Sequence, residues 1–179
     1  MNGHAREEFV LRHIRATYGA FIDAAAAVHR HRPEVLAAIM CRESEGGLSP
    51  LLDQQGPAGR GDGGHGHGLT QIDDRSFPEF CHGPDWADPA KNIDMGAFIL
   101  RRKRIYLAGR SVGYRLTDAD LERATIAAYN AGEGRVLRCI IEGRHVDSVT
   151  AHLNYSREVL RIAEAVLRLQ ILDGGPGGP

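Results

Sequence analysis

"GRGDGGHGHGLTQIDD", residues 59–74, is the stretch of sequence that decides the fold. It places Asp62 and Asp73 on either side of a run of glycines. The glycines between Asp62 and Leu69 permit a tight reversal of the chain, with the backbone close to a ligand. A hairpin of this kind would bring Asp62 back near Asp73. Read alone, the stretch also fits a metal loop, a phosphate cradle or a flexible tether.

The end of this stretch has the two-residue period of a short strand. Thr70 and Ile72 alternate with Gln71 and Asp73, so Gln71 and Asp73 are expected to point together, away from the covered face. The rest of the segment from residue 46 to residue 90 has no helical period. We therefore predict a small β-hairpin region in the middle of the chain.

On both sides of this region, apolar residues have the spacing of helices. Apolar residues recur at helical intervals, Pro33 suits a first helical position, and Thr117 suits an N-cap. The predicted helices cover residues 7–18, 21–30, 33–45, 91–108, 118–129, 135–142 and about 154–170. The fold class that follows is α-rich α+β: a single domain over residues 1–172, with a helical body and a small hairpin region. A flexible Gly/Pro tail is expected over residues 173–179.

Composition excludes several classes of protein. The 179 residues are 42% hydrophobic and 25% charged, which suits one soluble domain with a real core. The 22 Lys and Arg residues nearly balance the 23 Asp and Glu residues, so the formal net charge is −1. A chain with this net charge has no overall positive field to attract nucleic acid or an anionic membrane. Residues 1–20 carry several charges and resemble no signal peptide, and no window approaches a membrane span. We expect no nucleic-acid partner and no membrane insertion.

The cysteines and histidines raise the question of a metal site. Cys41, Cys81 and Cys139 are widely spaced, odd in number and without a paired Cys-x-x-Cys motif, so we predict buried free thiols. His65 and His67 lie near Asp62, with Cys81 and His82 further along, and such side chains can bind zinc. No standard spacing joins them, however. We predict no metal and no cofactor.

One carboxylate stands where a core residue is expected. The apolar stripe of the helix predicted over residues 33–45 includes Leu36, Ile39 and Met40, and its next position is Glu43. Glu43 either lies past the fraying end of this helix and points to water, or is half-buried at the edge of a cleft. The second arrangement would raise the pKa of Glu43 by desolvation, as a general acid requires.

Three separated motifs resemble one family. "AAIMCRESEGG" (residues 37–47), "GRGDGGHGHGLTQID" (59–73) and "AAYNAGEGRV" (127–136) occur in the order of the catalytic-helix, hairpin and Tyr-Asn-Ala-Gly motifs of goose-type lysozymes and the related lytic transglycosylases. Their spacing is also similar. The resemblance covers roughly residues 18–167, and its last element is Tyr155 in the predicted terminal helix. It implies a lysozyme-like domain.

The resemblance implies roles for individual residues. Glu43 is similar to the catalytic acid of the family, and Asp62 and Asp73 are similar to the two aspartates with which goose-type lysozymes hold and activate water. Sugar-binding or site-shaping roles are implied for Gln71, Tyr129, Asn130, Tyr155 and His67. Without the resemblance, Tyr129 and Asn130 would be read as an ordinary helix end.

The sequence departs from the family pattern at two positions of the hairpin motif. An aromatic residue is frequent where His67 stands, and methionine is frequent where Thr70 stands. Either change affects a sugar contact or the packing of the hairpin, and neither removes a proposed catalytic group. His67 is a candidate for stacking on a sugar or for adjusting the pH profile.

The function implied by the resemblance is that of a peptidoglycan hydrolase. Such a muramidase cleaves the β-1,4 bond between N-acetylmuramic acid and N-acetylglucosamine. Cleavage with inversion needs an acid at the leaving oxygen and an ionised carboxylate about 6.5–9.5 Å away that activates water. Glu43 would be the acid, and Asp62 or Asp73 the base. The sequence leaves open which aspartate acts.

Two other functions remain as alternatives. A lytic transglycosylase uses the 6-hydroxyl of the muramic acid in place of water and leaves a 1,6-anhydro end. Because that reaction needs no second carboxylate, the presence of both Asp62 and Asp73 favours the hydrolase. A non-catalytic module that binds cell wall would have little reason to hold Glu43 on an apolar stripe.

The expected site of action is the bacterial cell wall, in an extracellular or periplasmic location. The expected partner is the glycan strand of peptidoglycan, and we expect a monomer. Without a recognisable signal peptide, the expected routes are release of the phage-lysin type, as for a bacteriolytic endolysin, virion-borne delivery, or export by a dedicated machine.

Overall fold

The structure is a computed structural model that describes residues 3–172, with side chains up to residue 170. The predicted tail at residues 173–179 lies outside the described residues. The chain forms two compact units: the first contains the described residues up to Ala97 and from Ile162 onward, and the second contains Phe98–Arg161. Helices and a small three-stranded antiparallel sheet make up the structure, which confirms the predicted α-rich α+β class. One catalytic domain over residues 1–172 stays a prediction.

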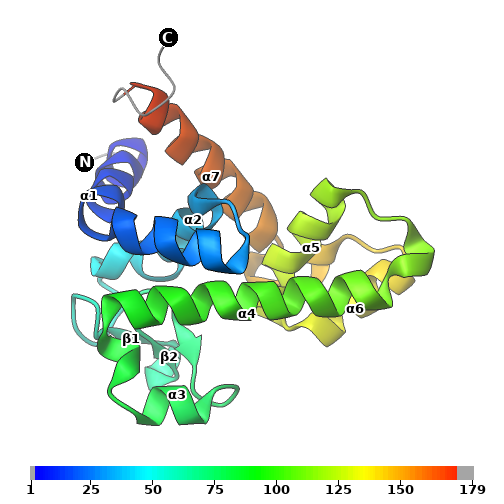
Figure 1. Cartoon of the computed structure of the whole chain (residues 1–179), viewed down its shortest axis with the longest axis horizontal. Helices are drawn as coiled ribbons and strands as arrows, with labels where there is room; N and C mark the ends of the chain where they lie inside the picture. Colours follow the sequence, from blue (N-terminus) through cyan, green and yellow to red (C-terminus); the bar gives the residue numbers. More distant parts are fainter. Residues whose placement is uncertain (1–2, 173–179) are drawn as a thin grey trace. The chain divides into compact units, whose positions relative to one another are not determined.

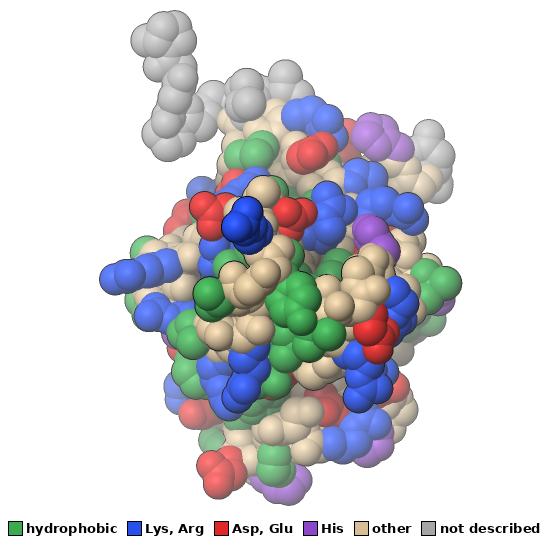
Figure 2. Space-filling model, turned by 90° about the vertical axis from the view of Figure 1, so that its right-hand side faces the viewer, with side chains coloured by type: hydrophobic (Ala, Val, Ile, Leu, Met, Phe, Trp, Pro, Cys, Tyr) green, Lys and Arg blue, Asp and Glu red, His purple; other side chains and the backbone are tan. Residues whose placement is uncertain are grey.

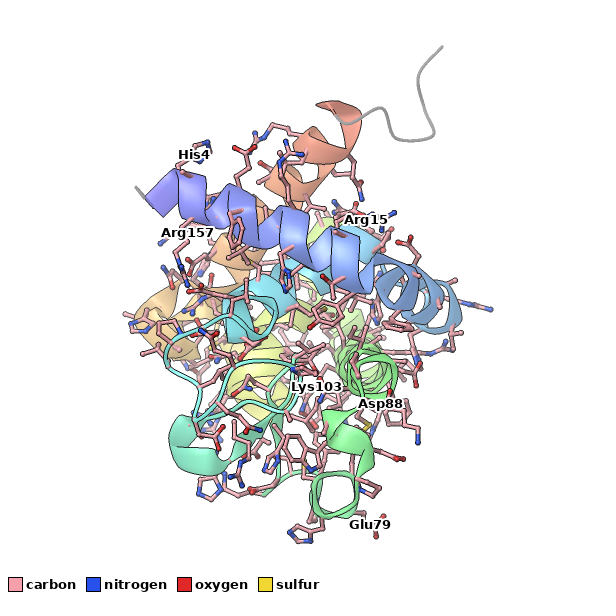
Figure 3. All side chains as sticks on the ribbon, turned by 90° about the vertical axis from the view of Figure 1, so that its left-hand side faces the viewer. His4, Arg15, Glu79, Asp88, Lys103 and Arg157 are labelled. Carbon is pink, nitrogen blue, oxygen red and sulfur yellow. The ribbon has the colours of Figure 1, made fainter. Side chains whose placement is uncertain are left out.

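In the first unit, helices α1 (Gly3–His29) and α2 (Pro33–Ser44) pack against each other (Figure 1). The prediction of separate helices over 7–18 and 21–30 is wrong, because α1 is continuous through Gly19. Gly19 is buried within α1. The packing of α1 on α2 stabilises the helix as a whole and outweighs the low helix propensity of one glycine. Arg15 projects from α1 and pairs with Asp23 (Figure 3).

Helix α2 is buried along most of its length. It starts at Pro33, as predicted, and it buries Val35, Leu36, Ala38, Ile39 and Met40. A helix that is apolar on nearly all sides belongs in a core. It ends at Ser44, where Glu45 adopts a left-handed conformation with φ of 50° and its N–H bonds back to the last turn. The predicted end at residue 45 is thus within one residue of the observed end.

The glycine-rich stretch folds into the predicted hairpin region. Strands β1 (Arg60–Gly61), β2 (Gly66–His67) and β3 (Ile72–Asp73) form an antiparallel sheet in that order. The register aligns Gly61, Gly66 and Asp73 across the sheet. The predicted strand over residues 70–73 is shorter than expected, because Gln71 adopts a left-handed φ of 51°. Thr70 and Ile72 are nevertheless buried, as their alternation predicted.

Short helical segments flank this sheet, and the sequence did not predict them. They are the 3-10 turns η1 (Glu45–Gly47), η2 (Asp62–Gly64) and η3 (Asp85–Ala87), and the helix α3 (Pro78–His82), which contacts β3. Figure 3 labels Glu79 in α3 and Asp88 just before α4 (Pro89–Arg110).

A buried asparagine joins the start of α4 to the end of the hairpin. The side chain of Asn92 accepts hydrogen bonds from the backbone N–H of Thr70 (2.9 Å) and from Oγ1 of Thr70 (2.8 Å). It donates to the carbonyls of His67 (3.1 Å) and Trp86 (2.9 Å). Because Asn92 is only 1% exposed, these bonds satisfy its whole amide inside the first unit.

The second unit contains the remaining helices. They are the later part of α4, η4 (Val112–Tyr114), α5 (Asp118–Ala131), α6 (Glu133–Ile141), η5 (Val146–Val149), η6 (Ala151–Leu153) and the start of α7 (Tyr155–Leu172). Thr117 caps α5 through a capping box with Asp120, as its position predicted, and Gly132 separates α5 from α6. The predicted bounds of α4 to α7 agree with the structure to within about two residues.

Charged side chains of both signs share the surface. Within the second unit, the basic stretch "RRKR" (residues 101–104) has acidic partners: Lys103 pairs with Glu133, and Arg104 pairs with Asp118 at 3.5 Å. Figure 2 shows Lys and Arg side chains spread over one face, with acidic and hydrophobic side chains among them. Across residues 3–172, none of the helices combines the length and the apolar character that a membrane span requires.

One buried carboxylate organises the start of α7. Asp147 in η5 is 1% exposed. Its Oδ1 accepts hydrogen bonds from the N–H of Ser156 (2.8 Å) and Oγ1 of Thr150 (3.1 Å). Its Oδ2 accepts from Oγ of Ser156 (2.8 Å) and the N–H of Arg157 (3.2 Å). Both oxygens therefore act only as acceptors, and the carboxylate satisfies N–H groups in the first turn of the helix.

Replacing Asp147 with Asn is expected to lower the free energy of unfolding at pH 7 by about 1.5–3 kcal/mol, because an amide NH₂ cannot accept the bonds that one carboxylate oxygen accepts. Burial acts to raise the pKa of Asp147, but the bonds from Ser156, Arg157 and Thr150 outweigh it, so this pKa lies below its ordinary value. The stabilisation is therefore complete above the unfolded pKa of about 3.9 and is lost as pH falls through the lower folded pKa.

Urea unfolding of both proteins between pH 7 and pH 2 measures this difference. The gap between wild type and Asp147→Asn should stay constant near neutrality and narrow below about pH 4. The matched control is Asp120→Asn in the exposed capping box of α5, which should cost about 1 kcal/mol or less. Equal unfolding free energies of wild type and Asp147→Asn at pH 7 would contradict the capping role.

Candidate active site

Glu43 lies half-buried in the last turn of α2, one residue before the helix ends. It therefore belongs to the helix and does not lie past its end, which was one of the two arrangements that the sequence allowed. The helix is fixed in the core by its buried apolar residues. A carboxylate in this position is held by rigid backbone, as a catalytic group needs.

The neighbouring serine connects this helix to the hairpin region. Ser44 is fully buried, and its Oγ donates a hydrogen bond of 2.6 Å to the carbonyl of Leu69. The same hydroxyl accepts a bond from the N–H of Gly47 (3.2 Å). Leu69 lies two positions before Gln71 and four before Asp73. The bond thus ties the helix end that carries Glu43 to the segment that leads into the hairpin carboxylate.

Gln71 holds the hairpin together from the inside. Its Nε2 donates to the carbonyls of Gly68 (2.7 Å) and Gly59 (3.2 Å). Its Oε1 lies against the strand backbone, where a Cβ on either Gly61 or Gly66 would come within 2.5 Å of it. The glycines of β1 and β2 therefore leave the space that this amide fills. This use of the amide favours the site-shaping role of Gln71 over a direct sugar contact.

Asp62 and Asp73 share a single guanidinium. Nη2 of Arg75 donates to Oδ2 of Asp62 at 2.7 Å, and Nε of Arg75 donates to Oδ1 of Asp73 at 2.6 Å. Oγ of Ser76 donates to the other oxygen of Asp73 at 2.6 Å. The hairpin therefore brings the two aspartates close together, as the glycine-rich sequence predicted.

The two carboxylates differ in exposure and in bonding. The side chain of Asp62 is 70% exposed and that of Asp73 is 34% exposed. Both oxygens of Asp73 accept hydrogen bonds, whereas Oδ1 of Asp62 accepts none from residues 3–172. Partial burial acts to raise the pKa of Asp73, but bonds from Ser76 and Arg75 outweigh it and hold this pKa below its ordinary value. Asp73 is therefore ionised near neutrality, and Asp62 has an oxygen open to water.

A third carboxylate, Asp74, is bonded to two histidines. Nδ1 of His65 lies 2.9 Å from Oδ1 of Asp74, and Nε2 of His67 lies 3.2 Å from Oδ2. The bond from His65 is the main reason why the pKa of Asp74 is lowered. The ring of His67 meets Trp86 edge to face at 4.8 Å, and its side chain is only 8% exposed. Such a covered ring offers little surface for a sugar to stack on.

The candidate zinc ligands of the sequence have other partners. His65 and His67 bond to Asp74, and Sγ of Cys81 donates to the carbonyl of Ile72 at 3.6 Å. Burial raises the pKa of the Cys81 thiol to about 11. Within residues 3–172, no three His, Cys, Asp or Glu side chains gather in a way that could hold a metal ion. Cys41, Cys81 and Cys139 are free and buried, as predicted.

The other candidate binding residues belong to the second unit. Tyr129 is half-buried near the end of α5, and Tyr155 is 2% exposed at the start of α7. Asn130 is exposed, and its Oδ1 accepts a hydrogen bond of 2.8 Å from the N–H of Ala151. Asn130 therefore has a structural role within this unit, but it joins α5 to η6 and does not cap the helix end. Sugar-binding roles for Tyr129, Asn130 and Tyr155 stay predictions.

Several residues of the site were not singled out from the sequence. Arg75 and Ser76 directly follow "IDD", and Ser44 directly follows Glu43, so their nearness to carboxylates was visible. Their bonds were not visible, because residues 13 positions apart (Arg75 and Asp62) or 25 apart (Ser44 and Leu69) meet only through the fold.

Comparison with known proteins agrees with these motifs. A family model described as "Transglycosylase SLT domain" matches residues 20–148, which is more than half of the chain. The matched segment contains Glu43, Asp62, Asp73 and the Tyr-Asn-Ala-Gly motif, and it ends before Tyr155. A search of curated proteins finds no match.

Proposed function

Because this chain belongs to the transglycosylase SLT domain family, a lysozyme-like family that acts on peptidoglycan, we propose that it is a peptidoglycan hydrolase that uses water. The bond cleaved is the β-1,4 linkage between N-acetylmuramic acid and N-acetylglucosamine. The observation that carries the proposal is the pair Asp62 and Asp73, which share the guanidinium of Arg75. The bond from Ser44 to Leu69 joins their hairpin region to the end of the helix that carries Glu43. An acid on a rigid helix and a pair of carboxylates on a bonded hairpin suit activation of water.

Glu43 is the proposed general acid. It gives its proton to the glycosidic oxygen as the bond between that oxygen and the anomeric carbon breaks. Its half-buried place on α2 and the bond from Ser44 to the hairpin support this role. A positioned acid of this kind accelerates bond cleavage by about 10²–10⁴-fold.

Asp62 and Asp73 are the proposed water-activating pair. The attacking water forms a bond to the anomeric carbon from the face opposite the leaving oxygen, and its proton passes to a carboxylate, so the configuration is inverted. The free Oδ1 of Asp62 supports Asp62 as the proton acceptor. Asp73, with both oxygens bonded, is better suited to fixing the geometry. Exchange with solvent then returns Glu43 and the base to their starting states.

A lytic transglycosylase is the second candidate, and the description of the matching family favours it. In that reaction the 6-hydroxyl of the muramic acid attacks the anomeric carbon and forms a 1,6-anhydro ring. Activation of water by a carboxylate pair has no place in it. The ionised Asp73 and its partner Asp62 therefore support water as the nucleophile.

The test is mass spectrometry of fragments released from purified peptidoglycan by the wild-type protein in ¹⁸O-labelled water. We expect reducing muramic ends that carry one ¹⁸O atom. Anhydro ends without the label would establish a transglycosylase instead. Binding to insoluble wall without release of fragments from any wall type would replace both proposals with a wall-binding module.

The proposed substrate also fixes where the protein works. The family acts on the cell wall, and the glycan strand is its partner. We propose that the protein acts as a monomer. Its proposed route to the wall is release of the phage-lysin type, delivery with a virion, or export by a dedicated machine.

A further inference from the structure

We infer that Arg75 is a positioning residue that fixes the distance between the carboxylates of Asp62 and Asp73 and keeps Asp73 ionised beside its neighbouring carboxylates. Arg75 lies just outside the family-like hairpin motif, which ends at Asp73. The inference rests on the proposed function, because activation of water by two carboxylates requires that neither of them holds a proton.

A neighbouring carboxylate disfavours the ionised form of an aspartate. Like charges a few ångströms apart raise one of the two pKa values, so that such a pair tends to share a proton. A proton on either carboxylate would remove a proton acceptor from the site. An arginine between them prevents this, because a guanidinium is always charged and presents several donors in a fixed plane.

The contacts of Arg75 match this requirement. One guanidinium donates from Nη2 to Asp62 and from Nε to Asp73, so it bridges two carboxylates and does not form a fork on one of them. Within residues 3–172, it is the only cation that bonds to either aspartate. With Arg75, the formal charge of the two ionised carboxylates and the guanidinium together is −1, compared with −2 for the two carboxylates alone. The bridge also holds the two carboxylates at the spacing set by its planar donors.

The surroundings leave this role to Arg75. Arg75 and Asp74 act directly on the charge of Asp73, Cys81 of α3 interacts with Asp73 and Asp74, and His65 and His67 act on Asp74. Arg60 in β1 pairs with Asp53, and α3 also carries Glu79 and His82. Asp74 acts to raise the pKa of Asp73, so it makes the pair harder to ionise. His65 and His67 bond to Asp74 and not to Asp62 or Asp73. Arg75 therefore supplies the charge that the pair needs.

The bridge contributes little to the stability of the fold. The side chain of Arg75 is 59% exposed, and that of Asp62 is 70% exposed. Exposed ion pairs contribute about 0–1 kcal/mol to stability. A variant without the guanidinium should therefore fold normally, and any loss of activity must come from the chemistry of the site.

The experiment compares Arg75→Gln and Arg75→Lys with wild type in kcat against pH on solubilised peptidoglycan. A neighbouring cation lowers a carboxylate pKa, and solvent screens this exposed pair, so Arg75→Gln should move the acid limb of the profile up by about half a pH unit. On the acid limb, kcat at a given pH should fall about threefold, and near pH 7 the shift should have no effect on kcat, with the melting temperature at neutral pH nearly unchanged. Arg75→Lys should restore the acid limb through its charge and leave kcat low, because a point charge lacks the planar fork.

The matched control is Arg60→Gln. Arg60 lies in β1 and pairs through Nε with Asp53 at 2.9 Å, so it is an exposed arginine of the same region without contact to Asp62 or Asp73. Its profile should follow that of wild type. An Arg75→Gln profile with the wild-type acid limb would overturn the inference, whether or not the melting temperature falls.

A second readout separates this inference from the proposed function. Carboxyl ¹³C NMR of the labelled aspartates, in wild type and Arg75→Gln, follows their titration without any catalysis. Asp73 should titrate at higher pH in the variant. If the products carry anhydro ends but this shift occurs, the hydrolase proposal fails and the role of Arg75 in ionisation stands. Unchanged titration would overturn the inference even for a confirmed hydrolase.

Discussion

Replacement of Glu43 by Gln is expected to lower the rate of fragment release from peptidoglycan by about 10²–10⁴-fold. Gln has the size of Glu and can occupy the same half-buried position in the last turn of α2. Its amide cannot supply a proton to the leaving oxygen, so the glycosidic bond must break without acid assistance. Release of soluble fragments and loss of wall turbidity measure the rate.

The control for this variant lies two residues away. Glu45 pairs with the exposed Arg6 and caps the end of α2, so Glu45→Gln changes a nearby carboxylate of the same type outside the proposed chemistry. It should retain a rate near that of wild type. Thermal unfolding of Glu43→Gln should match wild type as well. A Glu43→Gln protein with more than about a tenth of the wild-type rate would remove Glu43 from the role of acid.

The double variant Asp62→Asn with Asp73→Asn is expected to lose hydrolysis to a similar degree, about 10²–10⁴-fold. Neither amide can take a proton from water, so the nucleophile is no longer activated. Each single variant should lose less than the double variant if both carboxylates hold the water, and the losses should not add. Asp62→Asn should be the more damaging single change, because Asp62 has the free oxygen.

The products of this double variant distinguish the two reactions. A transglycosylase should still form anhydro ends at an appreciable rate, because its nucleophile is a hydroxyl of the substrate. Asp53→Asn is the matched control, since Asp53 pairs with Arg60 outside the carboxylate pair. Hydrolysis by the double variant at the wild-type rate would show that water is activated elsewhere.

Much of the fold could be predicted from the sequence, because helices are recognisable from the helical spacing of their apolar residues and from the capping residues at their ends. The stripe of α7, the capping box at Thr117 and the break at Gly132 fix their elements locally. The prediction of a break near Gly19 failed because the helix propensity of a single residue and the packing of the whole helix favour different structures. Gly19 does not interrupt α1, because the packing of this helix on α2 outweighs the low helix propensity of one glycine.

In the hairpin, the sequence pattern also predicted the position of an element better than its exact bounds. Its position followed from the glycines, but its third strand was predicted to start at Thr70. Gln71 takes a left-handed conformation that a strand does not allow, and its amide bonds to Gly68 and Gly59 hold it there. The alternation of apolar and polar residues does not indicate that the Gln71 side chain forms these bonds. Short strands are decided by these contacts more than by β-propensity.

The site was predictable where it resembles a family motif and unpredictable where it depends on partners. Glu43, Asp62 and Asp73 stand in recognisable motifs, so they were found as candidates. Arg75 is an ordinary surface arginine in the sequence, and its place between two carboxylates exists only after the chain reverses.

The burial of Cys81 affects how readily its thiol oxidises at the cell wall. An enzyme of the cell wall meets surroundings outside the reducing cytoplasm, where exposed thiols oxidise or exchange into disulfides. Both reactions start from the thiolate, and a thiol with a pKa of about 11 forms that ion in about one molecule in ten thousand at pH 7. The chain can therefore keep a cysteine beside the strand of Asp73 without a redox liability there.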